Sequence, residues 1–376
     1  MNLAILCGAL EPGKDGVGDY SRRLAQACRG AGHNVLLGSL NDAWAQPSEP
    51  ETDGPEFRLS QDISWAERAG VTQTKLARFQ PDIVSLQLVP YAYHPRGFFG
   101  EMVREFTPWA REFIWQIMFH ELWLGLNSGD SLKFKLTGWW QKRCALSLFR
   151  ALAPAAVHTQ TGAYIEFLAE SGISAKRLPL FSNIDLRTPP ALEALFNLLR
   201  QHGADPESRS SETPVFVFFG SLHREWSPDL LIEKLARRKP LFVSIGRQGA
   251  TGQIVWNAFV TKFQNQATFV DLGEQPPEII SALFQWADAG VAATPWNLIE
   301  KSGSVAAMRE HGLPVVVTRN DFLPARFFEP EPAAGLYPIW REDFHFEKLA
   351  RTSAEARLPG VVARFLTDLQ ITSAAP

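Results

Sequence analysis

Residues 1–38, MNLAILCGALEPGKDGVGDYSRRLAQACRGAGHNVLLG, decide the fold class. An apolar run over residues 1–7 ends in a glycine-rich segment. Apolar side chains at helical spacing follow over residues 20–30, and a second apolar run occupies residues 35–38. The order strand, loop, helix, strand predicts a βαβ unit at the start of the chain.

Further short apolar runs extend this pattern along the chain. They are apolar throughout rather than alternating, which indicates parallel strands covered on both faces. We therefore expect two α/β halves, each with its own parallel sheet. The predicted strands are 82–87, 113–119 and 155–159 in the first half, and 215–219, 241–246, 268–273, 289–293 and 314–318 in the second.

A change of composition separates the two halves. Residues 186–212 contain Thr188-Pro189-Pro190, a short helical piece and the polar run 201–212, a composition that is typical of a linker. We predict an N-terminal domain over 1–185, a linker over 186–212 and a second α/β domain over 213–345. Residues 346–376 are expected to form a C-terminal helix and tail that pack back on the N-terminal domain. Ligands of open parallel sheets bind at the carboxyl ends of the strands, so two such domains imply a cleft between them.

The composition excludes several classes of protein. The chain has 376 residues, of which 45% are hydrophobic and 20% charged, as in soluble globular proteins. Its net charge of −3 gives no basic field for nucleic acid. No apolar stretch approaches the ~20 residues of a membrane span. Three cysteines without a secretory signal indicate reduced thiols and a cytoplasmic location.

The glycine-rich segment between the first strand and the first helix is the first candidate site. Gly13, Gly16 and Gly18 would let backbone amides approach a phosphate at a helix N-terminus. Their spacing matches neither the dinucleotide fingerprint nor a Walker loop. The alternative is a tight turn without a ligand.

A histidine at a strand end is the second candidate. His120 directly follows the run 113–119, where it can carry a proton or bind a substrate hydroxyl. Residue 124 is a leucine, so the H-E-x-x-H zinc motif is excluded. The alternative is a structural histidine.

The second half carries a hydroxyl- and lysine-rich loop before a helix. Lys301, Ser302, Gly303 and Ser304 converge there, and either serine can cap the helix. The same groups could instead hold a diphosphate. Arg224 and Arg247 also follow strand ends, where they either neutralise phosphate charge or lie on the surface. No Asp-x-Asp motif or Cys/His cluster suggests a metal.

In these stretches the chain resembles the retaining family 4 glycosyltransferases of the GT-B fold. The resemblance rests on residues 16–35, on Pro81–Gln87 and on residues 278–318, and it runs from residue 1 to about 320. It implies two Rossmann-like domains facing across a cleft.

The resemblance also implies roles for individual residues. Gly16 and Gly18 would lie against the donor sugar and diphosphate, His120 would contact a donor-sugar hydroxyl, and Glu300 to Ser304 would hold sugar and phosphate. The family's E-x7-E motif is absent, because Leu298 and Ala306 occupy its positions. Glu300, two residues out of register, is the candidate catalytic substitute beside His120, and Arg247 and Lys301 are candidates for the missing positive charge.

The sequence thus predicts a metal-independent, retaining glycosyltransferase without a cofactor. Its co-substrate would be a nucleotide-diphosphate sugar, and its acceptor a sugar, glycan or lipid-linked hydroxyl. Candidate acceptor-binding residues in the N-terminal half are Gln87, Tyr91, Tyr93, His94 and Trp123.

Five of the twelve tryptophans fall between residues 109 and 140, as core or as a binding wall. The basic and aromatic residues of 133–143 could also touch an anionic membrane surface, which would make the protein peripheral at the inner face of the membrane. The alternatives are a nucleotide-sugar-binding protein without transferase activity and an epimerase or phosphorylase. A dehydrogenase is disfavoured by the missing dinucleotide fingerprint.

Overall fold

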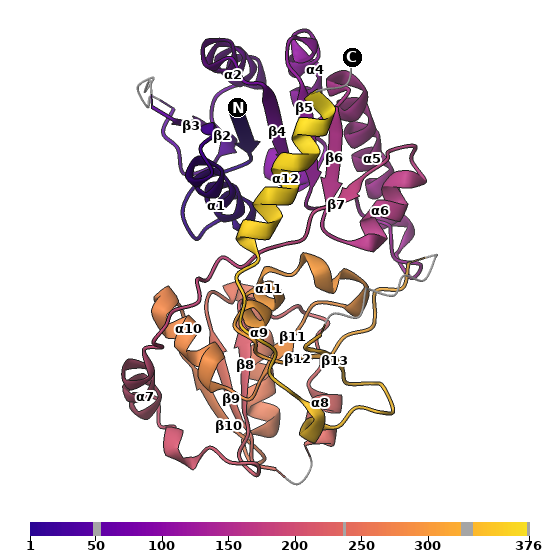
Figure 1. The fold of residues 1–376 in the computed structure, drawn as a ribbon. Coiled ribbons are helices and arrows are strands. Elements are labelled where there is room, and N and C mark those ends of the chain that lie inside the picture. Colours follow the sequence, from indigo (N-terminus) through magenta and orange to yellow (C-terminus); the bar gives the residue numbers. More distant parts are fainter. Residues whose placement is uncertain (48–53, 236–237, 325–333, 374–376) are drawn as a thin grey trace. The chain divides into compact units, whose positions relative to one another are not determined.

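The chain divides into two compact units, each described here by itself. The computed structural model describes residues 1–47, 54–235, 238–324 and 334–373 (Figure 1). Unit 1 comprises Met1–Pro179, Leu323–Phe328 and Leu358–Pro376, and unit 2 comprises Leu180–Phe322 and Glu329–Arg357. No described helix is both long and apolar enough to cross a membrane.

Unit 1 is built on a parallel sheet that has seven strands within the described residues, in the order β3-β2-β1-β4-β5-β6-β7. The strands are β1 (Asn2–Cys7), β2 (Asn34–Asp42), β3 (Glu56–Ser60), β4 (Ile83–Leu88), β5 (Trp115–Phe119), β6 (Ala156–Thr159) and β7 (Lys176–Arg177). The helices are α1 (Gly16–Gly30), α2 (Trp65–Phe79), α3 (Pro90–Tyr93), α4 (Gly100–Phe106), η1 (Ala110–Glu112), α5 (Leu132–Leu152), α6 (Gly162–Ala169) and α12 (Leu358–Ser373).

The last helix of the chain belongs to unit 1. Figure 1 shows α12, in yellow, lying along the sheet between α1 and β6, both of which it contacts. Lys176 of β7 bonds Asp368 of α12 at 2.6 Å. Residues 346–357, predicted to belong with this helix, lie in unit 2 instead.

Unit 2 repeats the plan with a parallel sheet of six strands among its described residues, in the order β10-β9-β8-β11-β12-β13. The strands are β8 (Val215–Phe219), β9 (Leu241–Ile245), β10 (Thr268–Asp271), β11 (Ala289–Ala292), β12 (Val315–Val317) and β13 (Leu336–Pro338). The helices are α7 (Leu192–Gln201), η2 (Pro206–Ser208), α8 (Asp229–Lys234), α9 (Gly249–Phe263), α10 (Pro277–Trp286), η3 (Trp296–Lys301), α11 (Gly303–Glu310) and η4 (Phe346–Lys348).

Burial on both faces explains the continuous apolar runs. Along β8, Val215 and Val217 pack into one core cluster while Phe216 and Phe218 pack into another. Successive strand residues point to opposite faces, so a strand covered on both sides must be apolar at every position. The eight apolar runs predicted as strands after residue 80 all overlap strands of the structure.

The segment predicted as a linker is part of unit 2. Residues 186–212 include α7, whose Leu195 and Leu199 are fully buried in the unit 2 core. The chain passes from unit 1 to unit 2 between Pro179 and Leu180. The polar residues that suggested a linker surround an amphipathic helix.

Two glycines in the first turn of α1 give a matched test of packing. A Cβ at Gly18 would stand 2.3 Å from the carbonyl oxygen of Ala9, whereas a Cβ at Gly16 would meet no atom within 4 Å. We expect Gly18→Ala to lower the free energy of unfolding by about 1–3 kcal/mol. Gly16→Ala should leave it unchanged or raise it by up to about 1 kcal/mol. Urea denaturation followed by circular dichroism measures both, and equal effects would contradict the packing argument.

Candidate functional site

The topology of each sheet indicates at which end of its strands a ligand would bind. The strand order reverses between β1 and β4 in unit 1, and between β8 and β11 in unit 2. Ligands of doubly wound sheets bind at the carboxyl ends of the strands beside such a switch point. The segments after these strands therefore form one candidate half-site in each unit, and the predicted cleft stays a prediction.

The glycine-rich segment after β1 uses its amides internally. The carboxylate of Asp15 caps α1 and accepts from the amides of Val17 (2.7 Å) and Gly18 (2.9 Å). The carboxylate of Asp19 accepts from the amide of Gly13 at 3.0 Å. Two carboxylates thus accept hydrogen bonds from backbone amides of the segment that was predicted to bind a diphosphate. Gly18 itself is explained by its close approach to Ala9.

His120 follows β5 and is buried, with 6% of its surface exposed. Its Nε2 lies 2.8 Å from Oε1 of Gln87, and its Nδ1 lies 2.6 Å from Nε2 of Gln160. The ring of Tyr20 packs edge-on against the imidazole, with centroids 4.8 Å apart. A substrate hydroxyl can reach a ring nitrogen only by displacing one of the two glutamine amides.

Gln87 continues this contact into a polar chain through the sheet. Its Nε2 donates to Oγ of Ser85 (2.7 Å), and that hydroxyl donates to Oε1 of Gln116 (2.5 Å). Nε2 of Gln116 lies 3.0 Å from Nδ1 of His158, whose Nε2 lies 3.1 Å from the carboxylate of Asp368. This polar chain of hydrogen bonds connects His120, after β5, with Asp368 of α12.

The candidate acceptor residues divide by burial. Gln87, Tyr93 and Trp123 are buried, and the hydroxyl of Tyr93 donates to the main-chain oxygen of Gln87 at 2.9 Å. These three are core or network residues and do not present a surface to an acceptor. Tyr91 is exposed, although its hydroxyl accepts from Gln141 at 3.0 Å. Nδ1 of His94 accepts from the amides of Arg96 and Phe98.

The tryptophans between residues 109 and 140 divide in the same way. Trp109, Trp115 and Trp123 are buried in unit 1, as core packing requires. Trp139 and Trp140 of α5 are each about half exposed, at 49% and 50%. Only this pair is available for a binding surface.

In unit 2, the loop between β11 and α11 lies beside the switch point. Oγ of Ser302 caps α11 by accepting from the amide of Val305 at 3.4 Å, and it also contacts the hydroxyls of Thr294 and Ser304. Lys301 and Ser304 are half-buried, and Gly303 is exposed. Glu300 is half-buried one residue before Lys301. The loop gathers hydroxyls and a cation at a helix N-terminus, where the helix dipole favours an anion.

The predicted arginines of unit 2 are exposed and paired with carboxylates. Arg247 makes a bidentate contact with Glu274 (2.9 and 2.8 Å), and Arg224 lies 3.8 Å from Glu225. Arg319 was not among the predicted site residues. It follows β12, is only 7% exposed, and pairs with Asp321 and Glu225. The available signal was an arginine two residues beyond a buried strand.

Three buried acceptor atoms at these strand ends have no hydrogen-bond partner. They are Oε1 of Gln160 after β6, Oε1 of Gln248 after β9 and Oδ1 of Asn297 after β11. Buried polar atoms are rarely left unpaired, so each is a candidate acceptor for a ligand hydroxyl. Across the described residues, no group of three His, Cys, Asp or Glu side chains is placed to hold a metal ion.

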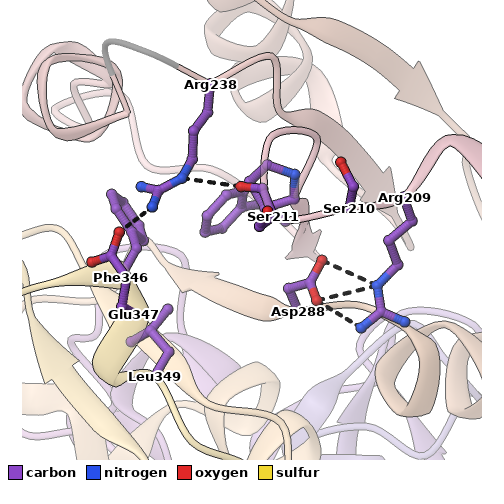
Figure 2. A pocket seen from close by; sticks show the side chains of 10 residues that line it. Arg209, Ser210, Ser211, Arg238, Asp288, Phe346, Glu347 and Leu349 are labelled. Atoms are coloured by element: carbon purple, nitrogen blue, oxygen red, sulfur yellow. Dashed lines mark hydrogen bonds and ion pairs between the residues drawn. The ribbon is translucent and has the colours of Figure 1, made fainter.

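A pocket of about 460 Å³ lies at the opposite, amino edge of the unit 2 sheet (Figure 2). Its lining includes Arg209, which pairs with Asp288 at 2.6 Å, and Arg238, which pairs with Glu347. Both guanidinium groups are neutralised within the pocket wall. Its position before β8 and β11 separates it from the strand ends where ligands of such sheets bind.

Comparison with known proteins establishes the fold. No protein-family model and no curated protein matches the chain. Among solved structures it is similar to Anabaena HepE in complex with UDP and glucose (TM-score 0.56, 16% identity, 99% of this chain and 92% of that one). It is also similar to WaaG, a glycosyltransferase involved in lipopolysaccharide biosynthesis (0.51, 14%, 98% and 93%), and to the Methanocaldococcus jannaschii UDP-GlcNAc 2-epimerase (0.52, 12%, 98% and 99%). The predicted GT-B fold is confirmed.

The buried His158 makes stability depend on pH. Burial lowers its pKa despite the opposing effect of the Asp368 carboxylate. The unfolded protein therefore takes up a proton on His158 near the ordinary pKa of about 6.5, while the folded protein does so only at a lower pH. As the pH falls from about 7 to about 5, we expect the free energy of unfolding to drop by at most about 1.4 kcal/mol per pH unit on this account. In His158→Gln the drop should be smaller, and an unchanged pH profile would contradict the assignment.

Proposed function

We propose that the protein is a metal-independent glycosyltransferase that moves a sugar from a nucleotide-diphosphate sugar to an acceptor hydroxyl. The observation that carries the proposal is the loop between β11 and α11, which brings Lys301, Ser302 and Ser304 to a helix N-terminus beside the switch point. The shared fold with HepE, which was crystallised with UDP and glucose, supports a nucleotide-sugar donor.

In this proposal the loop stabilises the departing diphosphate. Negative charge grows on the leaving oxygen as the sugar bond breaks, and a fixed cation and helix dipole lower the energy of that state. Lys301 supplies the cation and the first turn of α11 supplies the dipole. Glu300 and His120 are the candidate residues for the donor sugar, and the resemblance to family 4 enzymes implies retention of configuration.

An epimerase on the same fold is the second candidate, because the similar structures include a UDP-GlcNAc 2-epimerase. The two activities leave different products. Incubation with a panel of nucleotide sugars, with and without sugar acceptors, followed by chromatography distinguishes them. Free nucleotide diphosphate with a glycosylated acceptor indicates transfer, and an isomerised nucleotide sugar indicates epimerisation. Tight binding of a nucleotide sugar from the panel, without any product, would indicate a binding protein.

Lys301 can be tested against a lysine at the other edge of the same sheet. We expect Lys301→Ala to lower kcat/KM for the donor by about a hundredfold, because it removes one fixed charge from the leaving group. Lys234 is exposed at the end of α8, on the side where β9 begins, and serves as the control. Lys234→Ala should leave kcat/KM unchanged. Equal rates in the two variants would remove the loop from the proposed site.

The acceptor is proposed to be lipid-linked and reached at an anionic membrane surface. One face of α5 packs on unit 1 through Gly138, Gln141 and Ala145. Its outer face carries apolar side chains at helical spacing with basic ones around them, which is the pattern of a helix lying in a membrane interface. The outer-face residues are Leu132 (85% exposed), Leu136 (63%), Trp139 and Trp140, with Lys133, Lys135 and Arg143 also exposed.

Cosedimentation with phospholipid vesicles tests this surface. We expect the protein to sediment with anionic vesicles and much less with neutral ones. Leu136→Glu places a charge in the apolar face and should abolish sedimentation. Ile254 of α9 is similarly exposed, at 70%, so Ile254→Glu is the matched control and should sediment normally. Loss of binding in both variants, or in neither, would argue against α5.

A further inference from the structure

The polar chain through the unit 1 sheet ends in a carboxylate, and this gives it a direction. We propose that Asp368 of α12 is a positioning residue for His120. Acting through His158, Gln116, Ser85 and Gln87, it fixes the proton of the His120 imidazole on Nε2 and leaves the lone pair on Nδ1. The importance of this state for sugar transfer rests on the proposed function, but the state itself does not.

The direction follows from what each group can donate. A carboxylate only accepts, so the His158 nitrogen facing Asp368, Nε2, carries the proton. Nδ1 of a neutral His158 then accepts from the amide of Gln116. The amide oxygen of Gln116 is left to accept from the hydroxyl of Ser85. Each step has a single solution once the previous one is set.

The remaining steps reach His120. The hydroxyl of Ser85 donates to Gln116, so its oxygen accepts from the amide of Gln87. The amide oxygen of Gln87 then faces Nε2 of His120 at 2.8 Å and must receive a proton from it. Nδ1 of a neutral His120 accepts from the amide of Gln160 at 2.6 Å.

Burial isolates the chain from water, which would otherwise break the order. Ser85, Gln87, Gln116 and His158 are each at most 1% exposed. Asp368 is the end of the chain nearest solvent, with its side chain 13% exposed, and its second oxygen accepts from Lys176 at 2.6 Å. Burial opposes ionisation of Asp368, but hydrogen bonds from Lys176 and His158 outweigh it and lower its pKa. The positive charges of Arg364 and Lys176 also disfavour a second proton on His158, so its imidazole stays neutral.

The chain also explains the orphan atom beside His120. Oε1 of Gln160 has no partner because the Gln160 amide must turn its nitrogen toward Nδ1. With the opposite polarity, Oε1 would accept from Nδ1 and the orphan acceptor would disappear. The structure therefore leaves Oε1 of Gln160 as an unpaired acceptor after β6, where a sugar hydroxyl could donate to it.

Asp368→Asn is the decisive variant. The ammonium of Lys176 only donates, so the Asn oxygen should face Lys176 and the Asn nitrogen should face His158. His158 must then accept at Nε2, and the whole chain reverses as far as His120. Nitrogen chemical shifts of the histidine side chains in the isotope-labelled full chain report this directly. We expect the protonated and unprotonated nitrogen signals of both His158 and His120 to exchange positions.

Two controls separate the chain from general loosening of α12. Lys176→Met removes the same ion pair but keeps the carboxylate, so neither histidine should change. In the double variant Ser85→Ala with Asp368→Asn the polar chain of hydrogen bonds is interrupted. His158 should then reverse, while His120 keeps the state that it has in Ser85→Ala alone.

Three outcomes would each overturn the proposal: a wild-type His120 protonated at Nδ1, no reversal in Asp368→Asn, or reversal of His120 in the double variant. The shifts are measured without donor, so an inactive enzyme would leave this result standing, and a failed reversal would leave the transferase assay standing.

Discussion

Coverage of both sheets on both faces is the constraint on which the rest of the structure depends. Strands such as β8 are apolar at every position because neither face meets water. Ligand-binding residues are then expected at the strand ends, beside the switch points between β1 and β4 and between β8 and β11. A pocket also lies at the amino ends of the unit 2 strands, but the charged side chains that line it form ion pairs with one another.

Much of this could be predicted from the sequence because it depends on local patterns. Apolar runs revealed the central strands, and the hydroxyls before residue 305 predicted a capped helix, which the structure builds with Ser302. The role of the glycine-rich segment stays a prediction, because glycines show only that amides can be approached. They do not show that Asp15 and Asp19 take those amides first. The short strand β3 was missed because its neighbours are polar.

The polar chain could not be predicted because it depends on register. Ser85 and Gln87 sit in an apolar strand and look like isolated exceptions. Only the pairing of β4 with β5 sets Ser85 opposite Gln116, and only α12 brings Asp368 from the far end of the sequence to His158. A buried serine or glutamine in a parallel strand therefore has to be judged with its partners across the sheet. The same holds for His120, whose sequence position suggested an open strand-end histidine.

The discontinuity of unit 1 has a consequence for how the protein is made. Unit 1 begins at Met1 but is completed by α12, whose first residue is Leu358. A ribosome adds roughly 5–20 residues per second, so many seconds pass between the synthesis of the first 179 residues and that of α12. During translation, unit 2 can finish before the unit that precedes it. Until α12 has been made, α1 and β6 lack their contacts with it, and the His158 imidazole lacks its Asp368 partner.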